Sequence, residues 1–416
     1  MATAIRMRIA TGSTWLVAAF AASAAVAQPE WHQWRGADRD GHSHEQNLLQ
    51  AWPEGGPQRV FEVGGLGIGY SSFSAAGDRL VTMGATNDEE RVMALDARTG
   101  LVLWRTPNGP VFRNDRGDGP RGTPTIDGDR VFALGGNGRL VALELATGKV
   151  VWQVDLLREF GARNITWGIS ESPLVVDGKV LVNPGGRGAG VVALDRETGK
   201  VIWKSQDDGA GYSSAIVAEA GGTRQAIFLT AGRALGVDVA DGKLLWSYDR
   251  VANRTANAAT PIFHDGRVFV SSDYGTGCAL LEIGPRGATE VYFSREMRNH
   301  HSSSVRVGNT LYGFSSAILT AMDFATGRVL WQDRSVGKGS VIVGDGRLYL
   351  LSERGVVGLA EISPEGYREH GRFSLGRSEL PTWSHPIIHR GRLYLRDQDK
   401  LYAFEVGGGD ASSSAR

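Results

Sequence analysis

Residues 193–203 read Ala193-Leu194-Asp195-Arg196-Glu197-Thr198-Gly199-Lys200-Val201-Ile202-Trp203 and decide the fold. An apolar strand ends at an acidic residue, a Thr-Gly pair supplies a turn with positive φ, and a β-branched run leads to tryptophan. The stretch therefore predicts two antiparallel strands joined by a tight turn. Similar stretches occupy residues 94–104, 142–152, 236–246 and 321–331.

The spacing of these copies predicts a β-propeller. Their tryptophans recur roughly every 40 to 50 residues, except that the last interval is about twice as long and implies a hidden copy. Strand-only repeats of this length cannot bury their own faces, so each unit must pack on two neighbours. We therefore interpret the repeat tryptophans as core between blades. They are Trp104, Trp152, Trp203, Trp246 and Trp331.

Turn glycines set the number of blades at eight. Each follows one apolar strand and precedes another, at Gly77, Gly128, Gly178, Gly222, Gly266, Gly308, Gly346 and Gly391. Residues 279–293 and 358–373 are degenerate hairpins in blades five and seven. The eighth blade ends at residues 402–406, one strand short, and the isolated strand at residues 60–63 can complete it. The prediction is an all-β, eight-bladed β-propeller over residues 59–406, closed by pairing of its N-terminal strand with the C-terminal blade.

The flanking segments predict an exported protein. Residues 1–27 carry Arg6 and Arg8, a short apolar run and Ala25-Val26-Ala27, the pattern of a signal peptide cleaved before Gln28. No later run is long enough to span a membrane, and no cysteine follows the cleavage site to carry a lipid, so a periplasmic or secreted protein is expected. Residues 28–58 contain three tryptophans and predict an arm packed across the propeller. Residues 407–416 are a Gly/Ser tail that we expect to be disordered.

Composition excludes several classes of partner. Lys plus Arg and Asp plus Glu both total 45, so the chain has no net positive charge to attract nucleic acid or an anionic membrane. The single Cys278 permits no internal disulfide, and no haem-attachment motif is present. We expect a monomer.

Chemistry is expected where the innermost strands begin. In a propeller these strands line the central channel, and the residues just before them crowd one rim. These segments are 70–72, 121–123, 170–172, 212–214, 257–259, 300–302, 338–340 and 383–385. Their larger polar or aromatic members are Arg121, Glu171, Asn257, His300, His301, Lys338, Trp383 and His385. Such groups either pair with one another and with channel water or converge on a ligand.

The tandem repeats resemble those of pyrroloquinoline-quinone (PQQ) type propellers, and stretches such as WGISESPLVVDGKV and YDRVANRTANAATP are similar to exported bacterial PQQ-binding-like propeller proteins. By that resemblance to quinoprotein dehydrogenases, Glu171 and Asn257 would hold Ca²⁺. Arg121 and Lys338 would bind the cofactor, and Trp383 would stack on it. His301 is a candidate general base by role alone. The chain departs from those enzymes in lacking an adjacent cysteine pair, a cytochrome domain and a rim Asp.

Two functions therefore remain open. The first is a small-ligand or cofactor site on the rim, with PQQ and calcium as candidate cofactors and oxidation of an alcohol or sugar as a possible reaction. The second is a non-catalytic scaffold that binds envelope proteins, like the propeller lipoprotein of outer-membrane assembly. A transition-metal site would need one of His300 and His301 together with His385 and Glu171, because adjacent residues in a strand face opposite ways.

Overall fold

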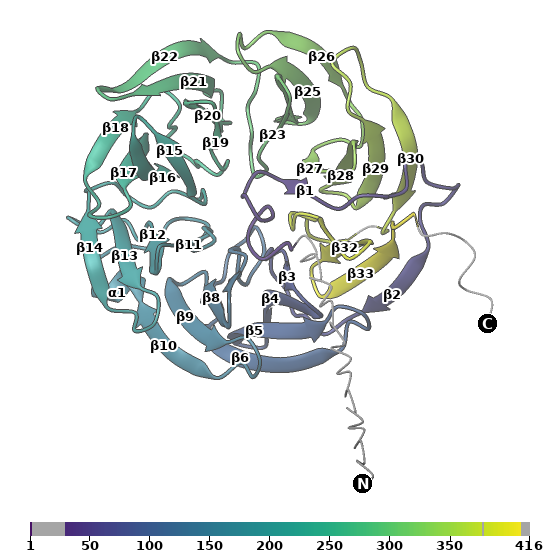
Figure 1. Ribbon diagram of the computed structural model, residues 1–416, viewed down its shortest axis with the longest axis horizontal. Helices are drawn as coiled ribbons and strands as arrows, with labels where there is room; N and C mark the ends of the chain where they lie inside the picture. The colour runs from purple at the N-terminus through teal and green to yellow at the C-terminus, as the bar shows by residue number, and fades with distance from the viewer. Residues whose placement is uncertain (2–29, 377, 409–416) are drawn as a thin grey trace.

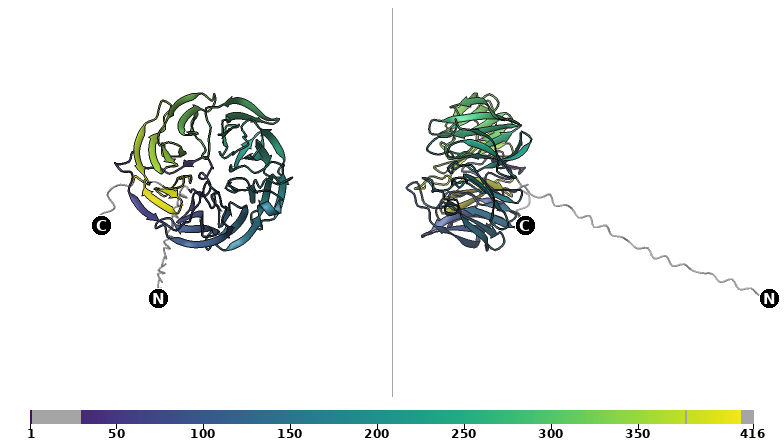
Figure 2. Two further views of the ribbon diagram at one scale, coloured as in Figure 1. Left: turned by 180° about the vertical axis from the view of Figure 1, so that it is seen from behind. Right: turned by 90° about the vertical axis from the view of Figure 1, so that its left-hand side faces the viewer.

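The computed structural model describes residues 30–376 and 378–408, together with Met1. Eight β-sheets, antiparallel apart from one short added strand, follow one another around a central channel (Figure 1). Seen edge-on, the ring is a flattened disc (Figure 2). The predicted eight-bladed propeller is confirmed.

The first four blades each contain four consecutive strands, numbered from the channel outward. Blade 1 has β3 (Ser74–Ala76), β4 (Arg79–Thr86), β5 (Glu89–Asp96) and β6 (Val102–Pro110). Blade 2 has β7 (Thr125–Asp127), β8 (Arg130–Leu134), β9 (Arg139–Glu144) and β10 (Val150–Asp155). Blade 3 has β11 (Leu174–Val176), β12 (Lys179–Val182), β13 (Val191–Asp195) and β14 (Val201–Ser205). Blade 4 has β15 (Ile216–Ala220), β16 (Thr223–Leu229), β17 (Ala234–Asp238) and β18 (Leu244–Tyr248).

The remaining blades include two strands from the N-terminal segment. Blade 5 has β19 (Ile262–His264), β20 (Arg267–Ser272), β21 (Gly277–Gly284) and β22 (Gly287–Ser294). Blade 6 has β23 (Val305–Val307), β24 (Thr310–Ser315), β25 (Ile318–Asp323) and β26 (Val329–Asp333). Blade 7 has β27 (Gly339–Gly344), β28 (Arg347–Ser352), β29 (Val356–Glu361) and β30 (Glu369–Ser374), with β1 (His42–Ser43) inside β27. Blade 8 has β31 (Ile387–His389), β32 (Arg392–Asp397), β33 (Lys400–Glu405) and β2 (Arg59–Val63).

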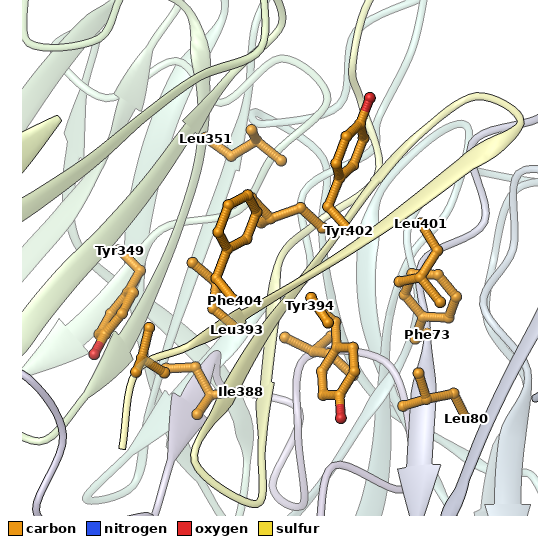
Figure 3. Close-up of a cluster of buried hydrophobic side chains, with 14 of the residues drawn as sticks. Phe73, Leu80, Tyr349, Leu351, Ile388, Leu393, Tyr394, Leu401, Tyr402 and Phe404 are labelled. Atoms are coloured by element: carbon orange, nitrogen blue, oxygen red, sulfur yellow. The ribbon is translucent and has the colours of Figure 1, made fainter. Parts of the chain in front are cut away.

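Blade 8 closes the ring by joining the two ends of the chain. Strand β2 pairs antiparallel with β33, with Glu62 opposite Tyr402 and Val63 opposite Leu401. The predicted closure is therefore confirmed. Around this blade a continuous core forms from the apolar faces of blades 7, 8 and 1, which Figure 3 shows with Tyr394 and Phe404 among its aromatic side chains. An outer strand from the other end of the chain thus leaves no blade incomplete.

In four blades the repeat tryptophan contacts the next blade. A bulge in β14 leaves Ile202 unpaired between Trp203 and Val201, and this turns the Trp203 indole toward blade 4. There Nε1 donates to Val239 O at 3.1 Å. A Cβ on Gly242, whose φ is +76°, would lie 2.5 Å from the indole ring, so only glycine permits this contact. Trp104, Trp152 and Trp331 likewise donate to a carbonyl of the following blade.

Blades 4 and 5 depart from this arrangement, and the outermost strands of blades 7 and 8 contain no tryptophan. In blade 5 Tyr292 takes the place of tryptophan, with its hydroxyl donating to Phe324 O at 3.0 Å and its ring against Gly327. Trp246 instead donates to Gln225 Oε1 within its own blade. Blade 5, whose repeat is hidden in the sequence, therefore has the aromatic contact with the next blade but makes it with a tyrosine instead of a tryptophan.

Hydroxyl groups link the innermost strands around part of the channel. A serine or threonine side chain at the start of one blade accepts from the backbone N–H of the preceding blade, which satisfies a donor where eight strands converge. The pairs are Ser72 N to Thr123 Oγ1, Thr123 N to Ser172 Oγ, Ser172 N to Ser214 Oγ and Thr260 N to Ser303 Oγ, at 2.9 to 3.1 Å.

The N-terminal arm, residues 30–58, enters the channel rather than lying across the outside. Its strand β1 pairs in parallel with β27, His42 opposite Val343, and it lies at the centre of the ring in Figure 1. Backbone contacts tie it to other blades through Ala75 N to Trp31 O, Ile126 N to His32 O and Leu49 N to Val406 O, at 2.7 to 2.8 Å.

Two buried arginines anchor the arm. Arg35 donates to Ser303 O and Ser304 O of the segment that enters blade 6. Arg39 donates to Ser172 O, Pro173 O and Ala215 O, and so joins blades 3 and 4. Burial lowers the pKa of Arg35 to about 10 and of Arg39 to about 9, so both guanidinium groups stay charged at neutral pH.

The described residues contain one helix, α1 (Leu156–Glu159), and none that is long and apolar enough to cross a membrane. Residues 2–27 of the predicted signal peptide and all but the first two residues of the predicted tail lie outside the described residues.

Candidate functional site

A cavity of about 600 Å³ occupies the mouth of the channel. The arm contacts the turns at one face of the disc, such as Gly77 and Gly391. The cavity is walled by the connections between blades, which lie at the other face because successive strands run in opposite directions. The lining residues are Trp34, Tyr70, Arg116, Arg121, Trp167, Ser170, Ser172, Tyr212, Ser214, Thr255, Ala256, Ala258, Tyr274, His300, His301, Lys338 and Trp383.

The lining is aromatic and cationic. Six of its side chains are tryptophan or tyrosine, three carry a fixed positive charge, and no Asp or Glu is among them. Aromatic faces favour flat ligands, and cationic side chains favour anions. The cavity is therefore suited to a planar organic anion.

Trp383 and Lys338, both predicted from the sequence, lie together on one wall. Lys338 Nζ is 3.4 Å from Glu353 Oε2 and 6.0 Å from the centre of the Trp383 ring. The Trp383 indole donates to the same carboxylate at 3.1 Å, and its ring lies 5.0 Å from that of Tyr70. Glu353 therefore orients both predicted residues from behind the wall.

Arg121 also lines the cavity, but most of its donors serve the loop that holds it. Its guanidinium donates to Trp167 O at 2.8 Å, to Gly117 O at 2.6 Å and to Gly119 O. It lies over the Phe112 ring at 4.7 Å. Burial lowers the pKa of Arg121, and nearby Tyr70 and Glu90 oppose the shift. Arg121 thus joins the loops before blades 2 and 3 and adds positive charge to the wall.

The adjacent histidines form a short chain of contacts. His300 Nε2 lies 3.0 Å from the Tyr274 hydroxyl, and its Nδ1 lies 3.3 Å from His301 Nδ1. The His301 ring faces Trp383 at 5.2 Å, while its Nε2 is buried with no hydrogen-bond partner among the described residues. Burial, reinforced by Lys338, holds the pKa of His301 well below its usual value. His301 is therefore neutral, and its Nε2 is buried.

Glu171 and Asn257 are turned into the fold behind the cavity. Glu171 Oε1 accepts from Asn183 N at 2.6 Å, and burial raises the pKa of Glu171 to about 8. Asn257 Oδ1 accepts from Asn253 N at 2.9 Å. Neither lines the cavity, and the described residues contain no cluster of three or more His, Cys, Asp or Glu able to hold a metal. These oxygens do not fit the calcium site that the resemblance implies.

Four aromatic or charged lining residues lie outside the predicted rim segments: Trp34, Arg116, Trp167 and Tyr274. Trp167 directly precedes a predicted rim segment, and Arg116 lies in the charged loop before blade 2, so a wider window around each rim segment would have found both. Tyr274 comes from the turn between β20 and β21 at the same face. Trp34 belongs to the arm, whose path through the channel has no signature in the sequence.

Comparison with known proteins relates the chain to two groups. The family model described as outer membrane protein assembly factor BamB matches residues 88–333, more than half of the chain. The outer membrane protein assembly factor BamB of Yersinia pestis is 25% identical over 290 residues, 66% of this chain and 71% of that protein. The dehydrogenase subunit of the quinone alcohol dehydrogenase of Gluconobacter oxydans is 33% identical over 157 residues, 33% of this chain but only 20% of that subunit.

Solved structures show the same fold. BamB from Moraxella catarrhalis superposes with a TM-score of 0.61 at 15% identity, over 85% of this chain and 98% of that one. The quinohemoprotein alcohol dehydrogenase from Comamonas testosteroni gives a TM-score of 0.68 at 14% identity, over 93% of this chain and 82% of that one. The chain belongs to the family of PQQ-type propeller repeat proteins whose model is described as outer membrane protein assembly factor BamB.

Proposed function

We propose that this protein binds a planar organic anion in the cavity at the channel mouth. The observation that carries the proposal is the lining itself, six tryptophan or tyrosine rings and three cations with no carboxylate among them. A ring of fused heterocycles bearing carboxylates, the class to which PQQ belongs, would pair its faces with the aromatic wall and its charges with Arg116 and Lys338.

The same geometry favours binding over oxidation. A quinoprotein reaction of the predicted type needs a hard cation beside the cofactor and a base near the substrate. Glu171 and Asn257 use their oxygens within the fold, while His301 has its Nδ1 against His300 and its Nε2 buried. The proposed activity is therefore capture of the ligand, without calcium-dependent turnover of an alcohol or sugar.

Calorimetric titration with PQQ, in the presence and absence of calcium, tests the proposal. Lys338→Met and Arg116→Met should each weaken binding about ten-fold or more, because a hydrogen bond to a charged group contributes roughly 1.5 to 3 kcal/mol. Lys200→Met, in an exposed turn at the opposite face, is the matched control and should bind as wild type. The affinity for PQQ should be the same in the presence and absence of calcium. Absence of binding by PQQ and by benzene-1,2,4-tricarboxylate, or calcium-dependent oxidation of an alcohol, would overturn the proposal.

A protein-binding scaffold is a second candidate, favoured by apolar side chains on the outer strands. Leu101, just before β6, and Leu103 within it are 65% and 49% exposed, and Val201 and Ile202 on β14 are 44% and 45% exposed. Outermost strands also present unpaired backbone groups. Cross-linking in cells should then identify envelope proteins whose capture is lost in Leu103→Glu but kept in Lys338→Met. The reverse pattern would favour the cavity.

We also propose that the chain is exported and acts in the cell envelope as a monomer. The pattern of residues 1–27 supports export. Mass spectrometry of the purified protein should show an N-terminus at Gln28, and light scattering should give the mass of one chain.

A further inference from the structure

We infer that the N-terminal arm supplies the floor of the cavity and that Trp34 sets the size of ligand that the cavity accepts. This rests on the proposed function for its ligand, while the floor itself is a statement about the fold. Trp34 is the one arm residue among the lining residues. The site is then built by the propeller and by a segment outside its repeats.

A tight turn presents Trp34 to the cavity. Gly36 N donates to Gln33 O at 3.1 Å, and Arg35 has a φ of +64°, so the chain reverses direction around Trp34 and Arg35. The Trp34 indole donates to Thr260 Oγ1 at 2.9 Å, which ties its outer edge to blade 5. The half-buried ring therefore has a defined position at the inner end of the cavity.

The residues beside Trp34 carry the anchoring, which leaves Trp34 free to contact a ligand. Arg35 is held by Ser303 O and Ser304 O, and Arg39 by carbonyls of blades 3 and 4. Arm backbone contacts secure the segments on either side. Replacing Trp34 should therefore change the floor without releasing the arm.

Trp34 covers a second imidazole. The His385 ring lies 4.5 Å from the Trp34 ring, is 3% exposed, and has two buried nitrogens with no hydrogen-bond partner among the described residues. Burial lowers the pKa of His385 to about 3, so the ring is neutral. Without the indole, the cavity would extend toward His385 and gain both depth and polar groups. The wild-type floor thus excludes ligands that need this extra depth.

Chemical labelling tests the floor without any ligand. Diethyl pyrocarbonate acylates neutral imidazole nitrogens that it can reach, and peptide mass spectrometry locates the adduct. His385 should be unlabelled in wild type and in Trp34→Phe, and labelled in Trp34→Ala. His389, buried in blade 8 with Nε2 on Gly77 O, is the control and should stay unlabelled throughout. An unlabelled His385 in Trp34→Ala, or labelling of both histidines, would overturn the floor assignment.

Ligand selectivity tests the inference that Trp34 sets the size of ligand that the cavity accepts. Dissociation constants for PQQ and for the smaller benzene-1,2,4-tricarboxylate are compared in wild type, Trp34→Phe, Trp34→Ala and Trp52→Phe. The ratio of the two dissociation constants should change about ten-fold in favour of PQQ, the larger probe, in Trp34→Ala and by less in Trp34→Phe. The reason is that the enlarged site loses stacking area and gains depth. Trp52→Phe, an arm variant packed on Phe373 away from the cavity, should leave the ratio unchanged. An unchanged ratio in Trp34→Ala would overturn the selectivity role. If wild type binds neither probe, the proposed function and this role both fail, while the labelling result still decides the floor.

Discussion

Replacing Trp203 by alanine should destabilise the protein by about 3 to 5 kcal/mol, as truncation of a large aromatic side chain in a core does. The substitution loses three things. They are the burial of a side chain that is only 8% exposed, the hydrogen bond to Val239 O and the packing contact with Gly242. Trp203→Phe keeps most of the packing and loses the hydrogen bond, so it should cost about 1 to 2 kcal/mol. Ligand binding by the folded protein should not change, because Trp203 lies outside the cavity.

Equilibrium urea unfolding of a double-mutant cycle isolates the contact between blades. Gly242→Ala should be destabilising in wild type, since its Cβ would lie 2.5 Å from the Trp203 ring and its φ is +76°. In the Trp203→Ala background the steric part disappears and the backbone part remains. Additive costs, or a Trp203→Ala cost below about 1 kcal/mol, would refute the role assigned to this tryptophan.

Other parts of the fold give three more predictions. Deleting residues 398–416 removes β33 and should abolish the cooperative unfolding transition measured by circular dichroism, which the closure of blade 8 requires. Arg39→Met should make the arm sensitive to limited proteolysis, because it leaves buried carbonyls of blades 3 and 4 without a donor, whereas exposed Arg98→Met should not. Burial raises the pKa of Glu171 from 4.5 to about 8, so the native state binds the extra proton and stability should fall as pH rises across that window. Glu171→Gln should flatten the stability profile measured by urea unfolding between pH 5 and 8, and an unchanged slope would contradict the assignment.

The fold could be predicted because its repeat signals are local. The Thr-Gly turn before Trp203 and the glycine that opens each blade occur at regular spacing, and the strands follow from alternating burial. Even the degenerate fifth blade was located, although the sequence did not show that Tyr292 replaces the tryptophan. The path of the arm could not be predicted. Strand β1 has only two residues, and its partner is chosen by tertiary contacts that leave no periodic pattern.

In the candidate site, the sequence predicted the positions of residues but not the directions of their side chains. Residues just before the innermost strands were expected at the rim, and Arg121, His301, Lys338 and Trp383 do line the cavity. Glu171 lies in an equivalent position in the chain, yet its carboxylate points toward Asn183 N. Position within a repeat determines where the Cα lies. The direction of a side chain depends on buried donors from other segments, and sequence spacing does not contain that information.

The arm also constrains the order in which the molecule can assemble. It is the first described segment to be synthesised, but its contacts extend across the ring to blade 8, where Glu45 accepts from Arg390 N, 345 residues away. Loops of this length close slowly, and contacts between such distant residues form late in folding. Until the last blade exists, β2 has no partner and the arm lacks its contacts with blade 8. A chain stalled before residue 390 would therefore leave β2 unpaired and the ring open, exposed to chaperones and proteases, and synthesis of the final hairpin completes the contacts of the first described segment.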